Sequence, residues 1–197
     1  MTRVKKTAGT PVAVNGVGMG ITDLVASLGT IAGAHGVGRI DMVENRVVGI
    51  KSREIYDTPA AVVLHLAHRE LTKLVMSRDL DRFSRIVSAQ YADIIYNGLW
   101  FTPIREALDA FVEKVQERAT GVIRMKLFKG GCHIVGRKSP FTLYDHGLAT
   151  YESGDSYDHA AAAGFIKILG LPVALSAQKA TRIGPKPDQS RQSLVTP

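Results

Sequence analysis

The chain has 197 residues, of which 45% are hydrophobic and 22% are charged. This composition is typical of a globular protein that buries one good-sized core. We find no run of about 20 apolar residues that would span a bilayer, and no apolar signal region follows the basic start MTRVKK. We therefore expect a soluble, cytoplasmic protein that does not bind a membrane.

The cysteine count and the distribution of charge exclude further classes. The single cysteine, Cys132, cannot form an internal disulfide framework or a cysteine cluster for zinc, and we interpret it as a small apolar residue of a strand. The net charge of +7 is concentrated in residues 1–6 and 171–197. The middle of the chain is nearly neutral and has no basic stripe interleaved with aromatics, so we do not expect nucleic-acid binding.

In chain order, the first predicted element is a short strand in TPVAVNGVGMG, which runs into a glycine-rich turn. The segment ITDLVASLGTIAGAHG follows as a helix that ends near Gly36. The strands GRIDMVE and RVVGIKSREI are predicted to form a hairpin with its turn near Asn45. A second helix starts in DTPAAVVLHLAHRELTKLVM, where Thr58 is expected to cap the first N–H groups and Pro59 occupies the first helical position.

The second half of the chain continues with two amphipathic helices. The first starts near Arg78 and carries a continuous apolar face made of Phe83, Ile86, Val87, Tyr91, Ile94 and Ile95. The second starts at Thr102-Pro103 and has a similar face made of Ile104, Leu108, Phe111, Val112 and Val115. A hairpin with Gly130-Gly131 in its turn, a short helix in DHAAAAGFIKILG and a polar tail from Leu171 complete the chain. This order predicts an α+β fold, with antiparallel strands and hairpins packed against several amphipathic helices.

The segment VAVNGVGMGITDLV imitates a dinucleotide-binding fingerprint, because a strand leads through Gly16, Gly18 and Gly20 into a helix and Asp41 follows about twenty residues on. The third glycine comes one position early, and Asp41 lies inside its own strand. A plain glycine-rich turn is therefore favoured, and a small dinucleotide-binding protein stays as an alternative function.

Seven separated blocks carry a more specific resemblance. They include GVGRIDMVENRVVGIKSREIYDTP, AHRELTKL, YADIIYNGLWFTPIREAL, TGVIRMKLFKG, GRKSPFTLYD, LATYESGDSYD and AAGFIKILGLP. In this order they closely resemble the C-terminal half of the argininosuccinate synthase family. The resemblance covers residues 9–172, which sets apart a residual N-terminal segment, 1–8, and a basic tail, 173–197. One departure is Asp57-Thr58-Pro59-Ala60-Ala61, where the family usually has Glu-Thr-Pro-Gly-Gly.

The resemblance implies an ATP-dependent ligation of citrulline and aspartate to argininosuccinate, with release of AMP and pyrophosphate, in a cytoplasmic homotetramer. The family grips ATP, with its magnesium, through a Ser-Gly-Gly-Leu-Asp-Thr-Ser loop that this sequence does not contain. We therefore expect roughly half an enzyme that is inactive alone and holds no catalytic residue. An inactive remnant that only oligomerises is the second alternative.

The resemblance assigns citrulline binding to Glu44 and Tyr56. An ionised carboxylate accepts charge-assisted hydrogen bonds from a substrate ammonium, and a phenol can bond the same amino-acid head. The neighbouring bases Arg46, Lys51 and Arg53 are predicted to pair with Asp41, Glu54 and Asp57 and so to brace the hairpin. His65 and His68 lie three residues apart on a helix, but no third ligand has a matching spacing, so we predict a helix-surface role and no metal site.

Overall fold

The computed structural model describes residues 1–148 and 156–182, and the chain divides into a unit of residues 1–144 and a second unit that starts at residue 145. The first unit contains a five-stranded sheet in the order β3-β2-β1-β6-β7, with every neighbouring pair antiparallel. Its strands are β1 (Thr2–Thr7), β2 (Thr10–Val14), β3 (Val17–Gly18), β6 (Gly121–Phe128) and β7 (Gly131–Lys138). These antiparallel pairs and the helices around them confirm the predicted α+β fold.

The core lies between one face of this sheet and two helices, α1 (Ile21–Gly33) and α2 (Pro59–Val75). Strand β6 shows why, because its buried and more accessible residues alternate, which is the period of a strand that buries one face. The central core residues are Val4 and Val14 from the sheet's first strands, Leu24 and Leu28 from α1, Val63, Ala67 and Leu71 from α2, and Ile123, Met125 and Leu127 from β6.

Residues 1–8, which the sequence analysis set apart as a residual segment, contain the middle strand of the sheet. Strand β1 pairs with β2 on one side and with β6 on the other. Val4 is fully buried, and Lys6 is only 6% exposed. The cluster of bases at the start of the chain is therefore partly inside the protein.

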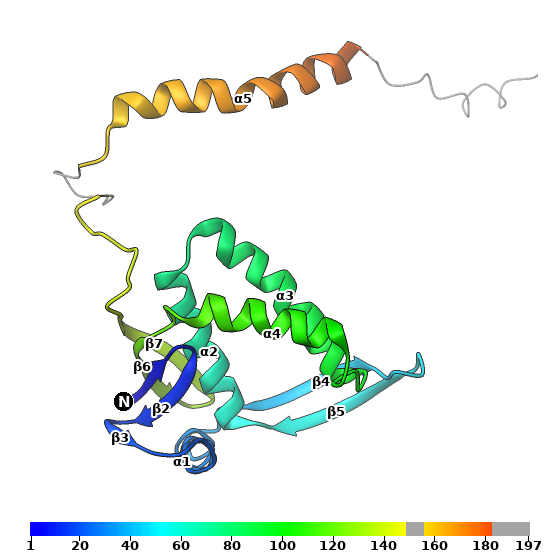
Figure 1. The fold of residues 1–197 in the computed structure, drawn as a ribbon, viewed down its shortest axis with the longest axis vertical. Coiled ribbons are helices and arrows are strands. Elements are labelled where there is room, and N and C mark those ends of the chain that lie inside the picture. Colours follow the sequence, from blue (N-terminus) through cyan, green and yellow to red (C-terminus); the bar gives the residue numbers. More distant parts are fainter. Residues whose placement is uncertain (149–155, 183–197) are drawn as a thin grey trace, which may run out of the picture. The chain divides into compact units, whose positions relative to one another are not determined.

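The second sheet is the hairpin of β4 (Arg39–Asn45) and β5 (Lys51–Asp57), which extends away from the core as a separate ribbon (Figure 1). The predicted turn near Asn45 is confirmed, although β5 starts at Lys51 and not at Arg46. A hydrogen bond from the Arg46 N–H to the Ile50 carbonyl closes the turn, and Gly49 supplies a positive φ of 86°.

Two long helices follow, α3 (Arg78–Tyr96) and α4 (Pro103–Gln116), and they pack edge to face through Phe83 and Phe111, with ring centroids 5.4 Å apart. The apolar face predicted for α3 is only partly covered, since Val87 and Ile94 are its buried residues. The predicted side-chain cap at Thr58 is wrong, because this side chain makes no capping hydrogen bond. The φ and ψ of Thr58, −127° and 56°, also lie outside the extended conformation that a capping residue usually adopts.

The dinucleotide fingerprint does not have the required topology. After Gly16 the chain reverses, and β3 pairs antiparallel with β2 before α1 begins. A dinucleotide site needs a strand that leads directly into its helix within a parallel unit. Asp41 lies on β4, where the Arg53 guanidinium binds its carboxylate. These contacts contradict the dinucleotide alternative.

The second unit contains α5 (His159–Arg182), which is much longer than the short helix predicted. It continues through Pro172, so the predicted tail is helical from residue 173 to residue 182, and residues 183–197 lie outside the described part of the chain. His159–Ala180 is long and apolar enough to cross a membrane, with a mean hydropathy of 1.7. The sequence analysis missed this stretch because it ended the helix before Pro172. A helix that packs against another protein has the same composition.

Candidate functional site

The β4–β5 hairpin places the two predicted citrulline residues on one face of its ribbon. Glu44 pairs with Ser52, and Tyr56 pairs with Ile40. Side chains alternate between the two faces of a strand, and these directly paired residues share a face. Glu44, Ser52, Glu54 and Tyr56 therefore lie on one face, while Asp41 and Arg53 lie on the other.

Glu44 is the centre of the first face. The Tyr56 hydroxyl donates to Glu44 Oε2 at 2.9 Å, and Arg46 Nη1 donates to Glu44 Oε1 at 2.9 Å. The Glu44 side chain is 15% exposed, whereas that of Arg46 is 49% exposed. Arg46 also lies 3.9 Å from Glu54 Oε1. The structure thus brings Glu44 and Tyr56 into direct contact and adds Arg46. The ion pair of Arg46 with Glu54 is among those predicted, whereas its closer contact with Glu44 was not predicted.

The charges in this group stabilise one another. The hydrogen bond to Glu44, followed by the negative charge of Glu54, raises the pKa of Arg46 above its ordinary value. The hydrogen bond to Glu44 is also the main cause that raises the pKa of Tyr56. Tyr56 therefore stays a phenol that donates to the carboxylate. Each carboxylate oxygen has two lone pairs, so Glu44 keeps acceptor capacity for a ligand ammonium.

The other charges of the hairpin have structural roles. Arg53 binds Asp41 in a bidentate pair, Nε to Oδ1 at 2.8 Å and Nη2 to Oδ2 at 2.5 Å, which confirms one predicted ion pair. Lys51 was predicted to pair with an acid, but it donates to the Asn45 side-chain oxygen at 2.7 Å, since these two residues are direct cross-strand partners. Within the described residues, no ion pair involves Asp57, although one was predicted.

Two residues near Glu44 were not found by sequence reasoning. Ser52 lies directly opposite Glu44, and its Oγ is buried without a hydrogen-bond partner among the described residues. Tyr96, the last residue of α3, donates its hydroxyl to the backbone carbonyl of Asn45 at 2.7 Å. A serine in an alternating strand carries no distinctive signal. The Tyr96 contact joins residues 51 positions apart and has no local pattern that would reveal it.

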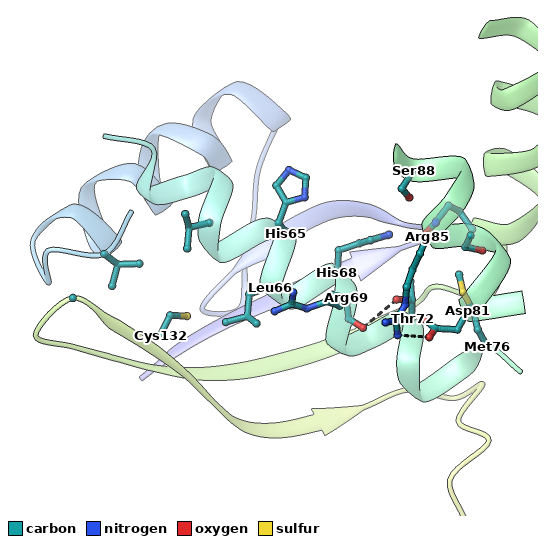
Figure 2. Close-up of a pocket in the computed structure, with 15 residues that line it drawn as sticks. His65, Leu66, His68, Arg69, Thr72, Met76, Asp81, Arg85, Ser88 and Cys132 are labelled. Atoms are coloured by element: carbon teal, nitrogen blue, oxygen red, sulfur yellow. Dashed lines mark hydrogen bonds and ion pairs between the residues drawn. The ribbon is translucent and has the colours of Figure 1, made fainter. Parts of the chain in front are cut away.

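A separate cavity of about 880 Å³ lies between α2, α3 and the β6–β7 turn (Figure 2). His65, His68 and Arg69 line it from α2, and Arg85 and Ser88 line it from α3. Its apolar wall includes Cys132, and burial raises the pKa of that thiol. None of the residues that line this cavity belongs to the β4–β5 hairpin.

The role predicted for His68 on the helix surface is wrong. Its Nδ1 lies 3.1 Å from the Nζ of the buried Lys6, and the Lys6 Nζ also donates to the Gly9 carbonyl at 3.1 Å. Burial, followed by the charges of Lys6 and His65, lowers the pKa of His68 to about 4. Burial also lowers the pKa of Lys6 to about 8. His68 is therefore neutral at pH 7 and accepts a hydrogen bond from the ammonium.

Two segments that resemble phosphate sites in the sequence, the Gly16 turn and the start of α1, lack the features of such a site. The glycine-rich turn at Gly16 closes the β2–β3 hairpin. The N-terminus of α1 has an acid, Asp23, in its first turn. This carboxylate repels a phosphate at the place where a helix would otherwise attract one.

Comparisons with known proteins agree with the sequence resemblance. Residues 1–176 match the family described as the arginosuccinate synthase C-terminal domain. The chain is 56% identical over 170 residues to the argininosuccinate synthase of Gloeobacter violaceus, which covers 86% of this chain and 43% of that protein. It is 54% identical over 169 residues to that of Symbiobacterium thermophilum, covering 86% and 42%. It is 55% identical over 170 residues to that of Brevibacillus brevis, covering 86% and 41%.

The chain thus spans less than half the length of these curated relatives. The family match extends over most of the chain, from the central strand β1 into α5. The chain belongs to the argininosuccinate synthase family and corresponds to the C-terminal half of its members.

Proposed function

We propose that this chain is the citrulline-binding part of an argininosuccinate synthase. The observation that carries the proposal is the contact between Glu44 and Tyr56, which the family resemblance selected and which lie 2.9 Å apart. Glu44 accepts hydrogen bonds from the citrulline α-ammonium, and Tyr56 orients the carboxylate. Arg46 compensates part of the negative charge of Glu44 and Glu54, so the face is not strongly acidic when the ligand is absent.

The reaction proposed for the complete enzyme joins citrulline and aspartate at the expense of ATP. The citrulline ureido oxygen attacks the α-phosphate of ATP and releases pyrophosphate, and the aspartate amine then displaces AMP from the resulting adenylate. Magnesium is expected to accompany ATP. The family's pyrophosphate loop does not occur in this sequence, so we assign the binding of ATP, and that of most of the aspartate, to a segment that contains this loop. The role of this chain is to hold and orient the amino-acid head of citrulline. No proton transfer is assigned to its residues.

The assembled enzyme is proposed to be a cytoplasmic homotetramer. Exposed apolar side chains on α5, such as Ile168 at 70% and Val173 at 71%, support an oligomer contact. The same observation favours a second candidate function, in which the chain is a non-catalytic remnant that only oligomerises. Citrulline binding separates the two candidates, since a remnant has no need to keep a substrate site.

An activity assay tests the proposal. We expect the purified chain alone to form no AMP from citrulline, aspartate and ATP. Mixed with the remaining N-terminal part of the Gloeobacter violaceus enzyme, it is expected to form argininosuccinate. In this mixture Glu44→Gln is expected to raise the KM for citrulline and to leave the KM values for ATP and aspartate nearly unchanged. Turnover by the chain alone contradicts the division of roles. An inactive mixture, together with no citrulline binding by NMR, contradicts the citrulline function and favours the remnant.

A further inference from the structure

The far end of the β4–β5 hairpin is attached to the helical part of the molecule through Tyr96. Its hydroxyl donates to the Asn45 carbonyl at 2.7 Å. Asn45 is the last residue of β4 and directly follows Glu44. Figure 1 shows the C-terminal end of α3 beside the hairpin ribbon, and the hydrogen bond shows that the two segments touch there.

This attachment matters because the hairpin joins the rest of the unit at its opposite end. At the base, the Thr58 N–H donates to the Gly38 carbonyl at 2.9 Å, where the ribbon joins α2. A strand rises about 3.3 Å per residue, so Glu44 lies roughly 20 Å from that base. The ribbon forms a sheet of its own and shares no ladder with the five-stranded sheet. A small rotation at the base therefore moves Glu44 by several times the displacement near Gly38.

The Tyr96 hydroxyl is carried by a well-defined helix end. The Asn97 N–H donates to the Asp93 carbonyl at 2.9 Å, and the Leu99 N–H donates to the Ile94 carbonyl at 2.9 Å. Gly98 has a φ of 69°, the left-handed conformation that commonly ends a helix. Ile94 is 1% exposed, which anchors this last turn in the protein interior. The hydroxyl is thus presented from a fixed position.

We propose that Tyr96 is a positioning residue for Glu44. Its hydrogen bond holds the far end of the hairpin, so that the Glu44 carboxylate stays where a citrulline ammonium can reach it. The inference rests on the proposed citrulline function. Tyr96 does not touch the ligand in this role, and it acts through the backbone of Asn45.

A distance measurement on the chain itself tests the attachment. Nitroxide labels are placed at Val48→Cys, in the hairpin turn, and at Glu113→Cys, on α4, in a Cys132→Ser background. Both label sites are exposed. Pulsed electron paramagnetic resonance is expected to give a narrow distance distribution, which Tyr96→Phe broadens. The matched control is Tyr91→Phe, which removes another tyrosine hydroxyl of α3, one that donates to Asp109 on α4 and does not reach the hairpin.

An NMR titration of the same variants with L-citrulline tests the consequence for the ligand. Tyr96→Phe is expected to weaken citrulline binding about two- to tenfold, the effect of one neutral hydrogen bond. Tyr91→Phe is expected to leave the affinity unchanged even where it lowers the Tm. This difference separates positioning from a general structural role.

The outcomes distinguish this inference from the proposed function. An unchanged distance distribution in Tyr96→Phe, with citrulline still bound by the unsubstituted chain, overturns the inference alone. A broadened distribution with unchanged citrulline affinity overturns the positioning role. If the unsubstituted chain binds no citrulline and Tyr96→Phe still broadens the distribution, the citrulline function of the chain is contradicted, and only the attachment of the hairpin is supported.

Discussion

The Tyr56 hydroxyl reaches Glu44 Oε2 at 2.9 Å although the two residues are not cross-strand partners. Tyr56 pairs with Ile40, four positions before Glu44 on the same strand. The tyrosine ring therefore runs along the ribbon, and its hydroxyl meets the carboxylate from the side of the hairpin base. This arrangement fixes the direction in which Glu44 presents its remaining lone pairs.

The charge of Glu44 is expected to control the affinity for citrulline. Glu44→Gln keeps the size of the side chain but replaces a charge-assisted hydrogen bond of about 1.5–3 kcal/mol by a neutral one of about 0.5–1.5 kcal/mol. The citrulline KM of the enzyme assembled with its nucleotide-binding part should rise roughly tenfold, and the KM values for ATP and aspartate should stay nearly constant. Tyr56→Phe should act in the same direction more weakly.

The opposite face of the ribbon supplies the control for Glu44. Asp41→Asn removes a carboxylate charge from the same strand, but its partner is Arg53 on the other face. We expect the citrulline KM of this variant to stay within about twofold of the unsubstituted value, because exposed ion pairs contribute little. Equal effects of Glu44→Gln and Asp41→Asn would contradict the assignment of the substrate face.

Gly38 is expected to be indispensable at the hairpin base. Its φ is 98°, and a Cβ there would lie less than 3.0 Å from backbone atoms of Thr58 and Pro59. Gly16 is the matched control, since its φ of 93° is similar but a Cβ would meet nothing within 4 Å. Gly16→Ala should therefore cost about 1–2 kcal/mol of unfolding free energy, from backbone strain alone.

Gly38→Ala adds a steric conflict with backbone atoms, so its cost should exceed about 4 kcal/mol. Urea unfolding of both variants measures the difference. If the two substitutions cost the same, Gly38 is required only for its left-handed conformation and not for the close approach of α2.

His68 is expected to make stability depend on pH. Its pKa is lowered from 6.5 to about 4 in the folded protein, mainly by burial. Between these two values the unfolded chain binds a proton that the folded protein does not, so acid favours unfolding. The contribution of the neutral His68 to the free energy of unfolding is complete above pH 6.5. It falls by about 3 kcal/mol as the pH decreases from 6.5 through 4. Lys6, with a pKa of about 8, stays protonated over this range.

Unfolding free energies of the unsubstituted chain and of His68→Gln, measured at pH 7, 5.5 and 4.5, test this expectation. The variant has no imidazole to protonate, so its stability should fall less steeply with acid. The carboxylates contribute to both proteins and cancel in the difference. If the unfolding free energies of the two proteins fell equally with decreasing pH, His68 would be hydrated in solution and its pKa would not be lowered by burial.

The α5 helix is expected to mediate self-association. Most of its large apolar side chains are more than half exposed, among them Phe165 at 63% and Leu169 at 61%. Light scattering at micromolar concentration should give a multimeric mass for the whole chain and a smaller mass for residues 1–144, which form a compact unit of their own. A monomeric mass for the whole chain would contradict this role of α5.

The elements with strong periodicity could be predicted from sequence, and the positions set by distant contacts could not. The turn near Asn45 and the proline at the start of α2 depend on local chemistry and were confirmed. The burial of Lys6 was missed because TRVKKT carries three bases and resembles a basic tail. Its place in the sheet depends on pairing with Gly121 in β6, more than one hundred residues away.

The candidate site shows the same division. Glu44 and Tyr56 came from the family resemblance, and the alternation of the two strands explains why they share a face. Arg46 forms an ion pair with Glu54, as predicted, but its closer contact with Glu44 was not predicted. The tight turn after Asn45 brings the guanidinium back to Glu44. Such a contact depends on the conformation of the turn, which a residue pattern does not specify.

The central position of β1 in the sheet also affects how the chain folds during synthesis. Thr2–Thr7 is synthesised before its partner Gly121–Phe128, which follows after more than one hundred further residues. Pairings between such distant segments form slowly because the intervening loop must close first. At roughly 5–20 residues per second, translation leaves one edge of β1 unpaired for about 6–25 seconds. During that interval the nascent chain exposes an open strand edge, a natural target for a chaperone on the ribosome.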